Sequence, residues 1–369
     1  MHSKQRLLAA LRHQPVDRVP ANITYYMAAF QRQHFAPQPG RDPFEAHLET
    51  QTRFCFDPLV GLGGGADRPW RLNAPGRWEA HQEHATGPHG QVVRYVVETP
   101  AGTLDTVYGG EADMSGWQLT PLVKEEGDLA ALAYMPDQAT NVEAINARWA
   151  QLGERGLGRV SINGIWQQAC YLRGMEDMAM DPYLRPEWTR AFLGIVADWL
   201  ARQTEALCRS QAEAFYINES YVGMGLSRSL FDEFVRPYDQ RFMDIAKAVG
   251  KLVMFHDCGL ANALLESFAD MGIDYLEPLN PRAASGDVEL ADVKRRIGAR
   301  VCLCGGFNHE LLSFGSAEEI RREVAFCLET LAPGGGYILC PAGPLDTDVP
   351  MANLEAYADA ARELCGAYA

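Results

Sequence analysis

From about residue 159 onward, short apolar runs alternate with longer stretches in which apolar residues recur every three or four positions. Short apolar runs are typical of buried strands, and a spacing of three or four is typical of amphipathic helices. The strand-like runs are residues 159–163, 214–218, 251–256, 274–279, 300–306 and 336–341. The helical stretches are residues 186–209, 227–249, 261–271 and 316–331. This alternation predicts parallel strands joined by helical crossovers.

Two α/β architectures fit such a pattern, an open doubly wound sheet and a closed barrel. No G-x-G-x-x-G or G-x-x-x-x-G-K-[ST] motif follows a strand, so a nucleotide-binding open sheet loses its usual support. The six repeated units and an early strand expected at residues 19–24 approach the eight that a barrel requires. We therefore predict an α/β fold, a (β/α)8 TIM barrel, in which residues 1–369 form a single domain.

Residues 61–123 differ from the rest of the chain because they are rich in Gly, Pro and β-forming residues. Two β-rich runs flank the sequence Pro100-Ala101-Gly102. Such a turn between two runs predicts a β-hairpin, which we place as an insertion on a barrel loop.

Composition excludes some classes of partner. The chain has 33 Lys and Arg against 48 Asp and Glu, a formal charge of −15, which argues against nucleic-acid or anionic membrane surfaces. No stretch approaches the roughly 20 apolar residues of a membrane helix. Residues 1–18 lack the apolar core of a secretory signal, so we expect a cytoplasmic protein. The nine cysteines, an odd number, argue against a disulfide framework and leave buried thiols, a metal site or a reactive thiol open.

The most informative segment is His256-Asp257-Cys258-Gly259, at the end of an apolar run. Side chains alternate along a strand, so His256 and Cys258 share one face and Asp257 takes the other. If the strand belongs to a barrel, the pair lies at its C-terminal end, where barrel enzymes place their chemistry. Imidazole and thiolate groups at this spacing suit zinc, although a buried His beside a core Cys is an equal alternative.

Further donor groups end the later strands. Glu277 closes the next apolar run, where a buried carboxylate needs a metal, a basic residue or solvent beside it. Cys340 ends the run at residues 336–341, and we expect it to be a metal ligand. Cys304 is a second candidate at the end of its strand, whereas Cys302 and Cys327 fit core packing better.

Other polar and aromatic residues follow predicted strands. We expect Glu219 and Asn218 to act in catalysis, with a helix cap or a loop salt bridge as the structural alternative. His309 is a weaker candidate because it stands where a helix would begin. The residues expected to bind substrate are Asn22, Tyr25, Tyr26, Asn163, Trp166 and Asn308.

The order and spacing of several soft motifs resemble the uroporphyrinogen decarboxylase-like superfamily. Within it the chain resembles the zinc- and corrinoid-dependent methyltransferase branch more than the decarboxylases. The decarboxylases hold propionate groups with paired arginines near the N-terminus, and residues 21–27 contain no arginine. The matching segments are residues 11–20, 172–176, 229–238, 256–259, 305–308, 314–316, 335–341 and 350–354.

The resemblance implies a cofactor and a partner. Members of the methyltransferase branch hold Zn²⁺ with a His-x-Cys pair and a later Cys, and similar methionine synthases add a carboxylate. Carried over, these ligands are His256, Cys258, Glu277 and Cys340. Zinc would activate a thiol acceptor or polarise the heteroatom of a small O-, N- or S-methyl substrate. The methyl group would pass to or from a corrinoid (methylcobalamin) that a separate protein carries.

The sequence departs from the family pattern at the later Cys. That residue normally lies three positions after the Ser of an Ile-Leu-Ser-Pro-like run, but here Cys340 takes the Ser position and Gly343 the Cys position. Either the ligand has moved to Cys340, with Cys304 as a substitute, or the site lacks it.

The sequence is therefore consistent with three functions: a methyltransferase, a metal-independent decarboxylase or lyase on the same barrel, and a non-catalytic ligand-binding member. We expect the first. Similar proteins often form homodimers, but no subunit contact can be read from this sequence.

Overall fold

The computed structural model describes residues 1–23, 40, 42–65, 68–87, 90–110, 117–345 and 348–368. Tyr25 and Tyr26, both expected to bind substrate, lie outside the described residues.

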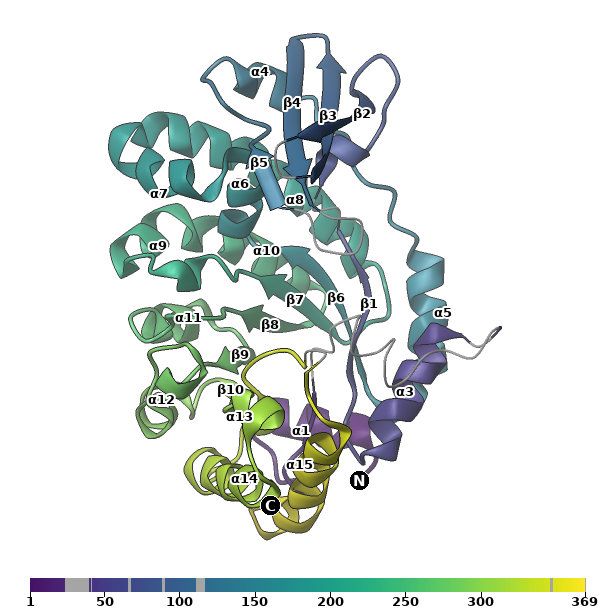
Figure 1. The fold of residues 1–369 in the computed structure, drawn as a ribbon, viewed down its shortest axis with the longest axis vertical. Coiled ribbons are helices and arrows are strands. Elements are labelled where there is room, and N and C mark those ends of the chain that lie inside the picture. The colour runs from purple at the N-terminus through teal and green to yellow at the C-terminus, as the bar shows by residue number, and fades with distance from the viewer. Residues whose placement is uncertain are drawn as a thin grey trace.

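A curled sheet of seven parallel strands forms the centre of the molecule (Figure 1). Its strand order is β1-β6-β7-β8-β9-β10-β11, so from β6 onward each new strand adds beside the one before it. The six strands predicted from residue 159 onward are all confirmed. The strands are β1 (Leu59–Gly64), β6 (Leu157–Asn163), β7 (Ala214–Asn218), β8 (Leu252–His256), β9 (Tyr275–Leu279), β10 (Cys302–Phe307) and β11 (Tyr337–Pro341).

Helices connect the strands and cover the outer face of the sheet (Figure 1). Ser316 and Glu319 form a capping box at the start of α14. The helix predicted at residues 227–249 is interrupted at Val235, before Pro237, and gives two helices. The helices are α1 (Ser3–Leu11), α3 (Pro43–Arg53), α4 (Asp128–Leu132), α5 (Val142–Leu152), α6 (Ile165–Arg173), α7 (Met175–Leu184), α8 (Pro186–Cys208), α9 (Arg228–Phe234), α10 (Arg236–Ala248), α11 (Leu265–Met271), α12 (Leu290–Ile297), α13 (Glu310–Phe314), α14 (Ala317–Leu331) and α15 (Met351–Leu364). Short 3₁₀ turns lie at Pro69–Arg71, Gly153–Arg155, Val222–Met224, Arg282–Ala284 and Cys365–Tyr368.

An extended segment near the N-terminus lies between the two edges of the curled sheet. Ala21 bridges Leu339 of β11 in parallel, and the Asn22 amide donates to the Leu339 carbonyl at 2.9 Å. On the other side, the Asp57 amide just before β1 donates to the Ala21 carbonyl at 2.7 Å. The early strand expected here is therefore present as an isolated bridge rather than as a full strand. Among the described residues the parallel sheet has seven strands and not the eight predicted, so the α/β fold is confirmed and the complete (β/α)8 barrel stays a prediction.

A second, antiparallel sheet of four strands stands at the top of Figure 1. Strands β3 and β4 pair from Thr99↔Gly102 outward, which confirms the predicted hairpin. The predicted insertion boundary needs one correction, because residues 61–64 belong to β1 of the central sheet and pair with β6. The strands are β2 (Glu79–Gly87), β3 (Gly90–Thr99), β4 (Gly102–Gly109) and β5 (Trp117–Thr120).

Helix α1 closes the N-terminal ends of the parallel strands. Its Leu7 and Leu11 are buried against residues that begin strands, among them Leu157, Ala214 and Cys302. Apolar burial of this kind contributes roughly 25 cal/mol per Å² of covered surface. The opposite, C-terminal ends of the strands are left for polar side chains.

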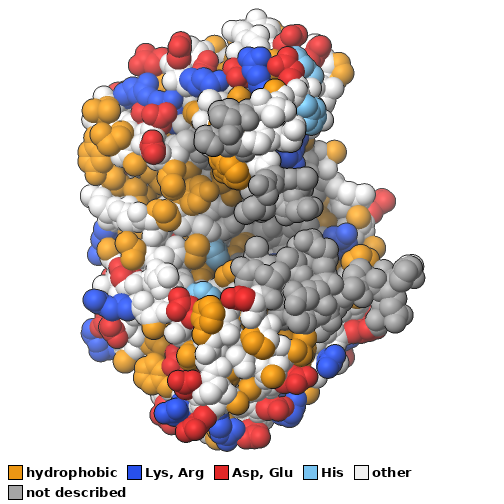
Figure 2. Space-filling model, in the orientation of Figure 1, with side chains coloured by type: hydrophobic (Ala, Val, Ile, Leu, Met, Phe, Trp, Pro, Cys, Tyr) orange, Lys and Arg blue, Asp and Glu red, His pale blue; other side chains and the backbone are white. Residues whose placement is uncertain are grey.

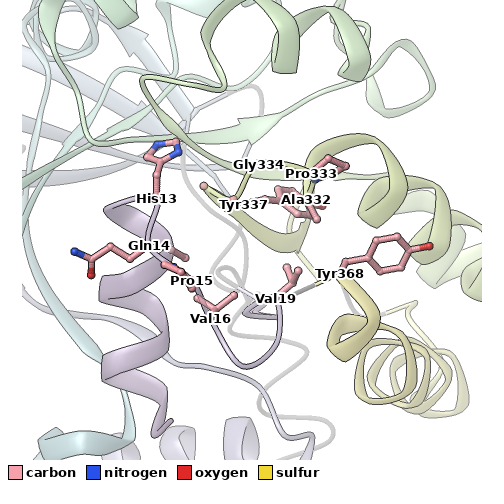
Figure 3. A pocket seen from close by; sticks show the side chains of 13 residues that line it. His13, Gln14, Pro15, Val16, Val19, Ala332, Pro333, Gly334, Tyr337 and Tyr368 are labelled. Atoms are coloured by element: carbon pink, nitrogen blue, oxygen red, sulfur yellow. The ribbon is translucent and has the colours of Figure 1, made fainter.

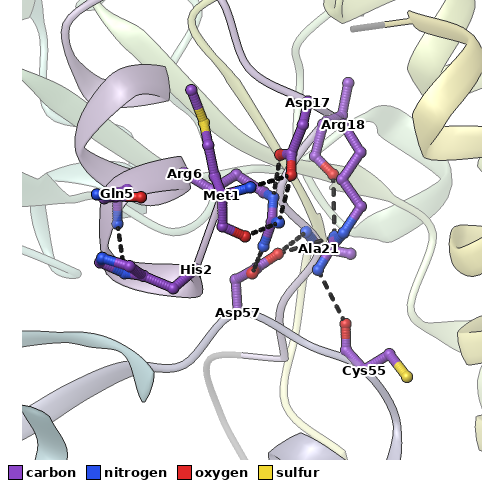
Figure 4. A network of polar contacts seen from close by, with 10 residues as sticks. Met1, His2, Gln5, Arg6, Asp17, Arg18, Ala21, Cys55 and Asp57 are labelled. Atoms are coloured by element: carbon purple, nitrogen blue, oxygen red, sulfur yellow. Dashed lines mark hydrogen bonds and ion pairs between the residues drawn. The ribbon is translucent and has the colours of Figure 1, made fainter. Parts of the chain in front are cut away.

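A buried ion-pair network fixes this helix and the N-terminal segment (Figure 4). Asp57, with no exposed side-chain surface, lies 2.6 Å from Arg6 Nη1 of α1 and 2.9 Å from Arg18 Nη1. Its second oxygen accepts the Ala21 amide at 3.2 Å. Arg6 also binds Asp17 at 2.7 Å, and this holds the pKa of Asp17 well below its usual range. The network thus joins α1, the N-terminal segment and the start of β1.

Asp57→Asn tests this network. The change removes the one negative charge that faces both Arg6 and Arg18, and leaving a buried charge without its partner costs about 3 kcal/mol or more. We expect the free energy of unfolding, measured by urea denaturation at pH 7, to fall by about that amount. The exposed Asp359→Asn is the control, with a change below about 0.5 kcal/mol. Equal stability of the two variants would contradict the assignment.

Candidate functional site

His256 and Cys258 lie at the C-terminal end of β8, as the sequence predicts, and their side chains hydrogen-bond each other. The chain turns away at Gly259, whose φ of +110° is unfavourable for other residues. A Cβ at Gly259 would also overlap the backbone carbonyl of Gly223. This close packing of two loops fixes Cys258, which is only partly buried, at the edge of the barrel interior.

Glu277 of β9 is the centre of the polar cluster below this pair. Its Oε1 lies 3.5 Å from His256 Nδ1, accepts the Tyr216 hydroxyl at 2.9 Å and lies 3.2 Å from Arg159 Nη1. Its Oε2 accepts the Tyr275 hydroxyl. The Arg159 guanidinium also stacks 3.8 Å from the centre of the Tyr216 ring. All five side chains are nine-tenths or more buried, so the carboxylate is held by a cation, an imidazole and two phenols.

These contacts set the charges of the cluster. Burial would raise the pKa of Glu277, but Arg159 and His256 hold it well below its usual range. Burial would lower the pKa of His256, but hydrogen bonds and charge from Cys258 and Glu277 raise it to about 9. Burial would raise the pKa of Cys258, and His256 and the Ser220 hydroxyl lower it. The geometry favours an imidazolium beside a thiol that gives up its proton readily.

The four predicted zinc ligands do not form one cluster. Cys340 lies on β11 against Cys304 of β10, and the two thiols hydrogen-bond each other inside the barrel. Both oxygens of Glu277 already accept hydrogen bonds, one of them in an ion pair with an arginine. Within the described part of the chain, no three His, Cys, Asp or Glu side chains are arranged to hold a metal ion. As they lie, His256 contacts both Cys258 and Glu277, whereas Cys340 contacts Cys304, so zinc held by these four residues would have to replace the present contacts and stays a prediction.

Glu219, expected to be catalytic, has a structural position. Its two oxygens accept the Trp166 and Gln167 amides at 2.6 and 2.9 Å, and it caps α6, whose Gly164 offers no side-chain cap. A Cβ at Gly164 would overlap the carboxyl group, so glycine is required there. Glu219 is fully buried beside Asp239, which bonds the first amide of α6. The helix-cap alternative is therefore the one the structure supports.

Asn163 and Asn218, at the ends of β6 and β7, join one hydrogen-bonded chain. Gln167 links them, because its amide nitrogen donates to Asn163 at 3.2 Å and its oxygen accepts the Ser220 amide at 2.9 Å. The Ser220 hydroxyl donates to Asn218 at 2.9 Å and lies against Cys258. Asn218 is thus linked to the thiol through Ser220, and Asn163 through Gln167 and Ser220, while their predicted roles in catalysis and substrate binding stay predictions.

The remaining candidates lie apart from this chain. Trp166, expected to bind substrate, is 4% exposed and packs in the core. Asn308 caps its own turn through the Glu310 amide at 3.1 Å. Asn22 is buried, and its side-chain amide has no hydrogen-bond partner among the described residues. His309 precedes α13 and its ring covers Gly343, where the family pattern has a Cys.

A cavity of about 690 Å³ lies between the antiparallel sheet and the junction of α6 and α7. Its wall includes Tyr221, whose pKa burial raises to about 12 with smaller contributions from Tyr171, Cys170 and Cys258. Tyr221 therefore lies near both the cavity and Cys258. The lining residues are Arg68, Tyr108, Trp117, Gln118, Leu119, Pro121, Cys170, Tyr171, Arg173, Gly174, Met175, Glu176, Asp177 and Tyr221.

A cavity of about 460 Å³ lies at the opposite end of the barrel, between the end of α1 and the glycines before β11 (Figure 3). Its lining includes His13, Val16, Tyr337 and Tyr368. Burial lowers the pKa of His13. Because barrel chemistry is found at the C-terminal ends of the strands, we assign this cavity no catalytic role.

Sequence reasoning missed Arg159, Tyr216 and Tyr275. Each carried a signal, because a charged or phenolic residue interrupts an otherwise apolar strand and needs a buried partner. Tyr275 also lies two positions before Glu277 and so shares its face. Asp239 carried no comparable signal, since it lies in a helix that reads as amphipathic.

The uroporphyrinogen decarboxylase (URO-D) family model matches residues 119–364. Uroporphyrinogen decarboxylase of Sodalis glossinidius is 27% identical over 191 residues, 50% of this chain and 51% of that protein. The enzyme of Methylibium petroleiphilum is 28% identical over 226 residues, 57% and 56% of the two chains. The chain thus spans about half the length of the curated relatives it matches.

Among solved structures, a methyltransferase from Methanosarcina mazei aligns with a TM-score of 0.64 at 18% identity. The alignment covers 98% of this chain and 99% of that one, so the two share a fold. Among the described residues, none of the helices has the length and apolar character needed to cross a membrane.

Asp239→Asn tests the buried carboxyl pair. Burial raises the pKa of Asp239 to about 7, and burial and Asp239 raise that of Glu219. The folded pair keeps a proton that the unfolded chain releases near pH 4, so the stabilisation is present at low pH and is lost as pH rises toward 7. Wild-type unfolding free energy should therefore fall relative to the variant over this range, by at most about 1.4 kcal/mol per pH unit. Urea denaturation at pH 5, 6, 7 and 8 measures the difference, and parallel curves would contradict it.

Proposed function

Because the chain belongs to the uroporphyrinogen decarboxylase (URO-D) family, we propose that it is an enzyme of this family that transfers a methyl group. The observation that carries the proposal is the His256–Cys258 pair at the C-terminal end of β8, anchored on Glu277. The family resemblance in the sequence and the shared fold with a methyltransferase support the same reaction class.

The arrangement suits proton transfer at a methylated heteroatom. Cys258 is the partly exposed member of the cluster, whereas His256 and Glu277 are buried beneath it. The thiol and the imidazole together hold a transferable proton, and Glu277 with Arg159 fixes the imidazole from below. Cys258, the group proposed to touch substrate, is therefore held in place by the buried side chains of His256 and Glu277.

The proposed step balances as follows. A nucleophile on the acceptor forms a new bond to the methyl carbon while the bond from carbon to the donor heteroatom breaks. The heteroatom takes the electron pair of that bond, and the Cys258–His256 pair supplies the proton that it then needs. Solvent returns a proton to the pair. Where a thiol is the methyl acceptor, the pair instead takes the proton that the thiol loses.

Tetrapyrrole decarboxylation, the activity that the names of the curated relatives state, is less well supported. A substrate with many carboxylates needs a positively charged lining. Arg159, the arginine of the polar cluster, is committed to Glu277 deep in the barrel. The sequence at residues 21–27 adds no arginine.

Zinc, and a corrinoid on a separate protein that docks over the strand ends, stay predictions from the family resemblance. The step above depends on neither of them. The sequence likewise predicts an O-, N- or S-methyl donor or a thiol acceptor, a possible homodimer and a cytoplasmic location.

Cys258→Ser tests the proposed function. The assay follows methyl exchange between free methylcobalamin and 2-mercaptoethanol in one direction, and between anisole and cob(I)alamin in the other, through the corrinoid absorbance. We expect the wild-type chain to catalyse at least one direction and the variant to lose about 100-fold or more, the usual contribution of a positioned acid–base group.

Phe314→Ala, an exposed residue of α13, is the matched control and should keep the wild-type rate within about twofold. Methyl transfer that is unchanged in Cys258→Ser would overturn the proposed role of the thiol. Decarboxylation of uroporphyrinogen by the wild-type chain, without methyl exchange, would establish the alternative activity.

A further inference from the structure

The cavity that Tyr221 lines is also lined by aromatic rings from two separate parts of the fold. Tyr108 and Trp117 come from strands β4 and β5 of the antiparallel sheet, and Tyr171 and Tyr221 come from the barrel side. Its volume of about 690 Å³ is within the range of small-molecule sites, roughly 300 to 1,000 Å³. The antiparallel sheet thus supplies one wall of the cavity.

Three of these rings are held firmly. Tyr108 stacks on the buried Trp70 with centroids 5.7 Å apart and meets the edge of Tyr95 at 6.2 Å. Tyr171 and Tyr221 meet edge to face at 5.6 Å and 84°. Rings whose orientation is already fixed lose little freedom when a ligand packs on them.

The rim of the cavity exposes apolar surface to water. Trp117, Leu119 and Met175 are 44%, 42% and 45% exposed. Further exposed apolar residues of α7 continue this surface, and hydrophobic side chains gather on the upper left of the molecule in Figure 2, where Figure 1 shows α7. An apolar rim around a concave site is typical of a surface that a ligand covers.

Aromatic rings bind both quaternary ammonium groups and planar aromatic rings, and the charged residues of the cavity wall distinguish between these two classes of ligand. A quaternary ammonium would use the ring faces through cation–π contacts. The wall carries Arg68 and Arg173 together with Glu176 and Asp177, and Arg173 is paired with Asp177 at 3.2 Å. Arg68 already lies 5.6 Å from the centre of the Tyr108 ring. A second cation on that ring would meet repulsion from Arg68, whereas a neutral planar ring would not.

We propose that this cavity binds a planar aromatic small molecule, stacked on Trp117 and Tyr108, with its reactive substituent toward Tyr221 and Cys258. The antiparallel sheet is then the part of the chain that selects the substrate. The chemistry at the substituent rests on the proposed function, but binding of the ring does not.

The test is ligand binding by the full chain, measured as dissociation constants from saturation-transfer NMR titrations. The probes are anisole, cyclohexyl methyl ether as the non-aromatic analogue of similar size, and choline as the quaternary ammonium. Wild-type protein should bind anisole about threefold or more tighter than the cyclohexyl ether, the range expected for an added aromatic contact, and should not bind choline.

Trp117→Ala should weaken anisole binding about tenfold and remove the preference for the aromatic ring, because it deletes both the stacking contact and apolar area. Trp117→Phe should restore binding to within about threefold, since the ring face is kept. Phe314→Ala, which removes an exposed ring far from the cavity lining, should bind as the wild type does.

Cys258→Ser should bind anisole within about twofold of the wild type, so that loss of methyl transfer and loss of binding are read separately. Three results would overturn the proposal: tighter binding of choline than of anisole, no binding of either ether, or unchanged anisole binding in Trp117→Ala. Anisole binding by the wild-type chain as expected, together with no methyl transfer by the wild-type chain, would overturn the proposed function alone.

Discussion

Glu277 is a carboxylate buried inside an apolar barrel, and the polar centre of the molecule is built around that constraint. A buried charge without a partner destabilises a fold by several kcal/mol, so the surrounding strands must each present a partner. Arg159 reaches it from β6, three positions away in the strand order. Neighbouring strands lie about 4.8 Å apart, so a flat sheet would hold β6 and β9 about 14 Å from each other. Their 3.2 Å contact depends on the curl of the sheet, which links the fold directly to the state of His256 and Cys258.

The alternation of apolar runs predicted the parallel strands, because buried strands must be apolar whatever their function. The same reasoning located His256 and Cys258, since alternation along a strand fixes which side chains share a face. It failed where a side chain's partner comes from a distant part of the chain. Glu219 read as a catalytic residue after a strand, but the amides that it caps begin a helix more than 50 residues earlier. Cys340 lies beside Cys304 because of the register between β10 and β11. The spacing of the two cysteines in the sequence does not predict that register.

The two sheets carry different kinds of functional group, and this explains why residues 61–123 contain none of the predicted site residues. The parallel sheet carries groups that need fixed positions, and its strands are apolar except at their ends. The antiparallel sheet carries polar residues and glycines over much of its length, and its chemistry lies in a few rings that face the barrel. A substrate wall built on a separate sheet can vary without disturbing the charged centre, which residues 157–341 hold within themselves.

The segment at residues 19–23 has a consequence for how the chain reaches its native state. Its hydrogen bonds join Ala21 to Asp57 on one side, and Val19 and Asn22 to Cys365 and Leu339 on the other. The last two contacts span more than 300 residues of sequence, and such loops close late because they are entropically costly. During synthesis on the ribosome, residues 19–23 are therefore made long before β11, and one of their edges stays unpaired until β11 has emerged. The carboxylates and arginines that later form the buried Asp57 network lie near that edge in the sequence, and charged side chains at an unpaired edge discourage its pairing with other chains.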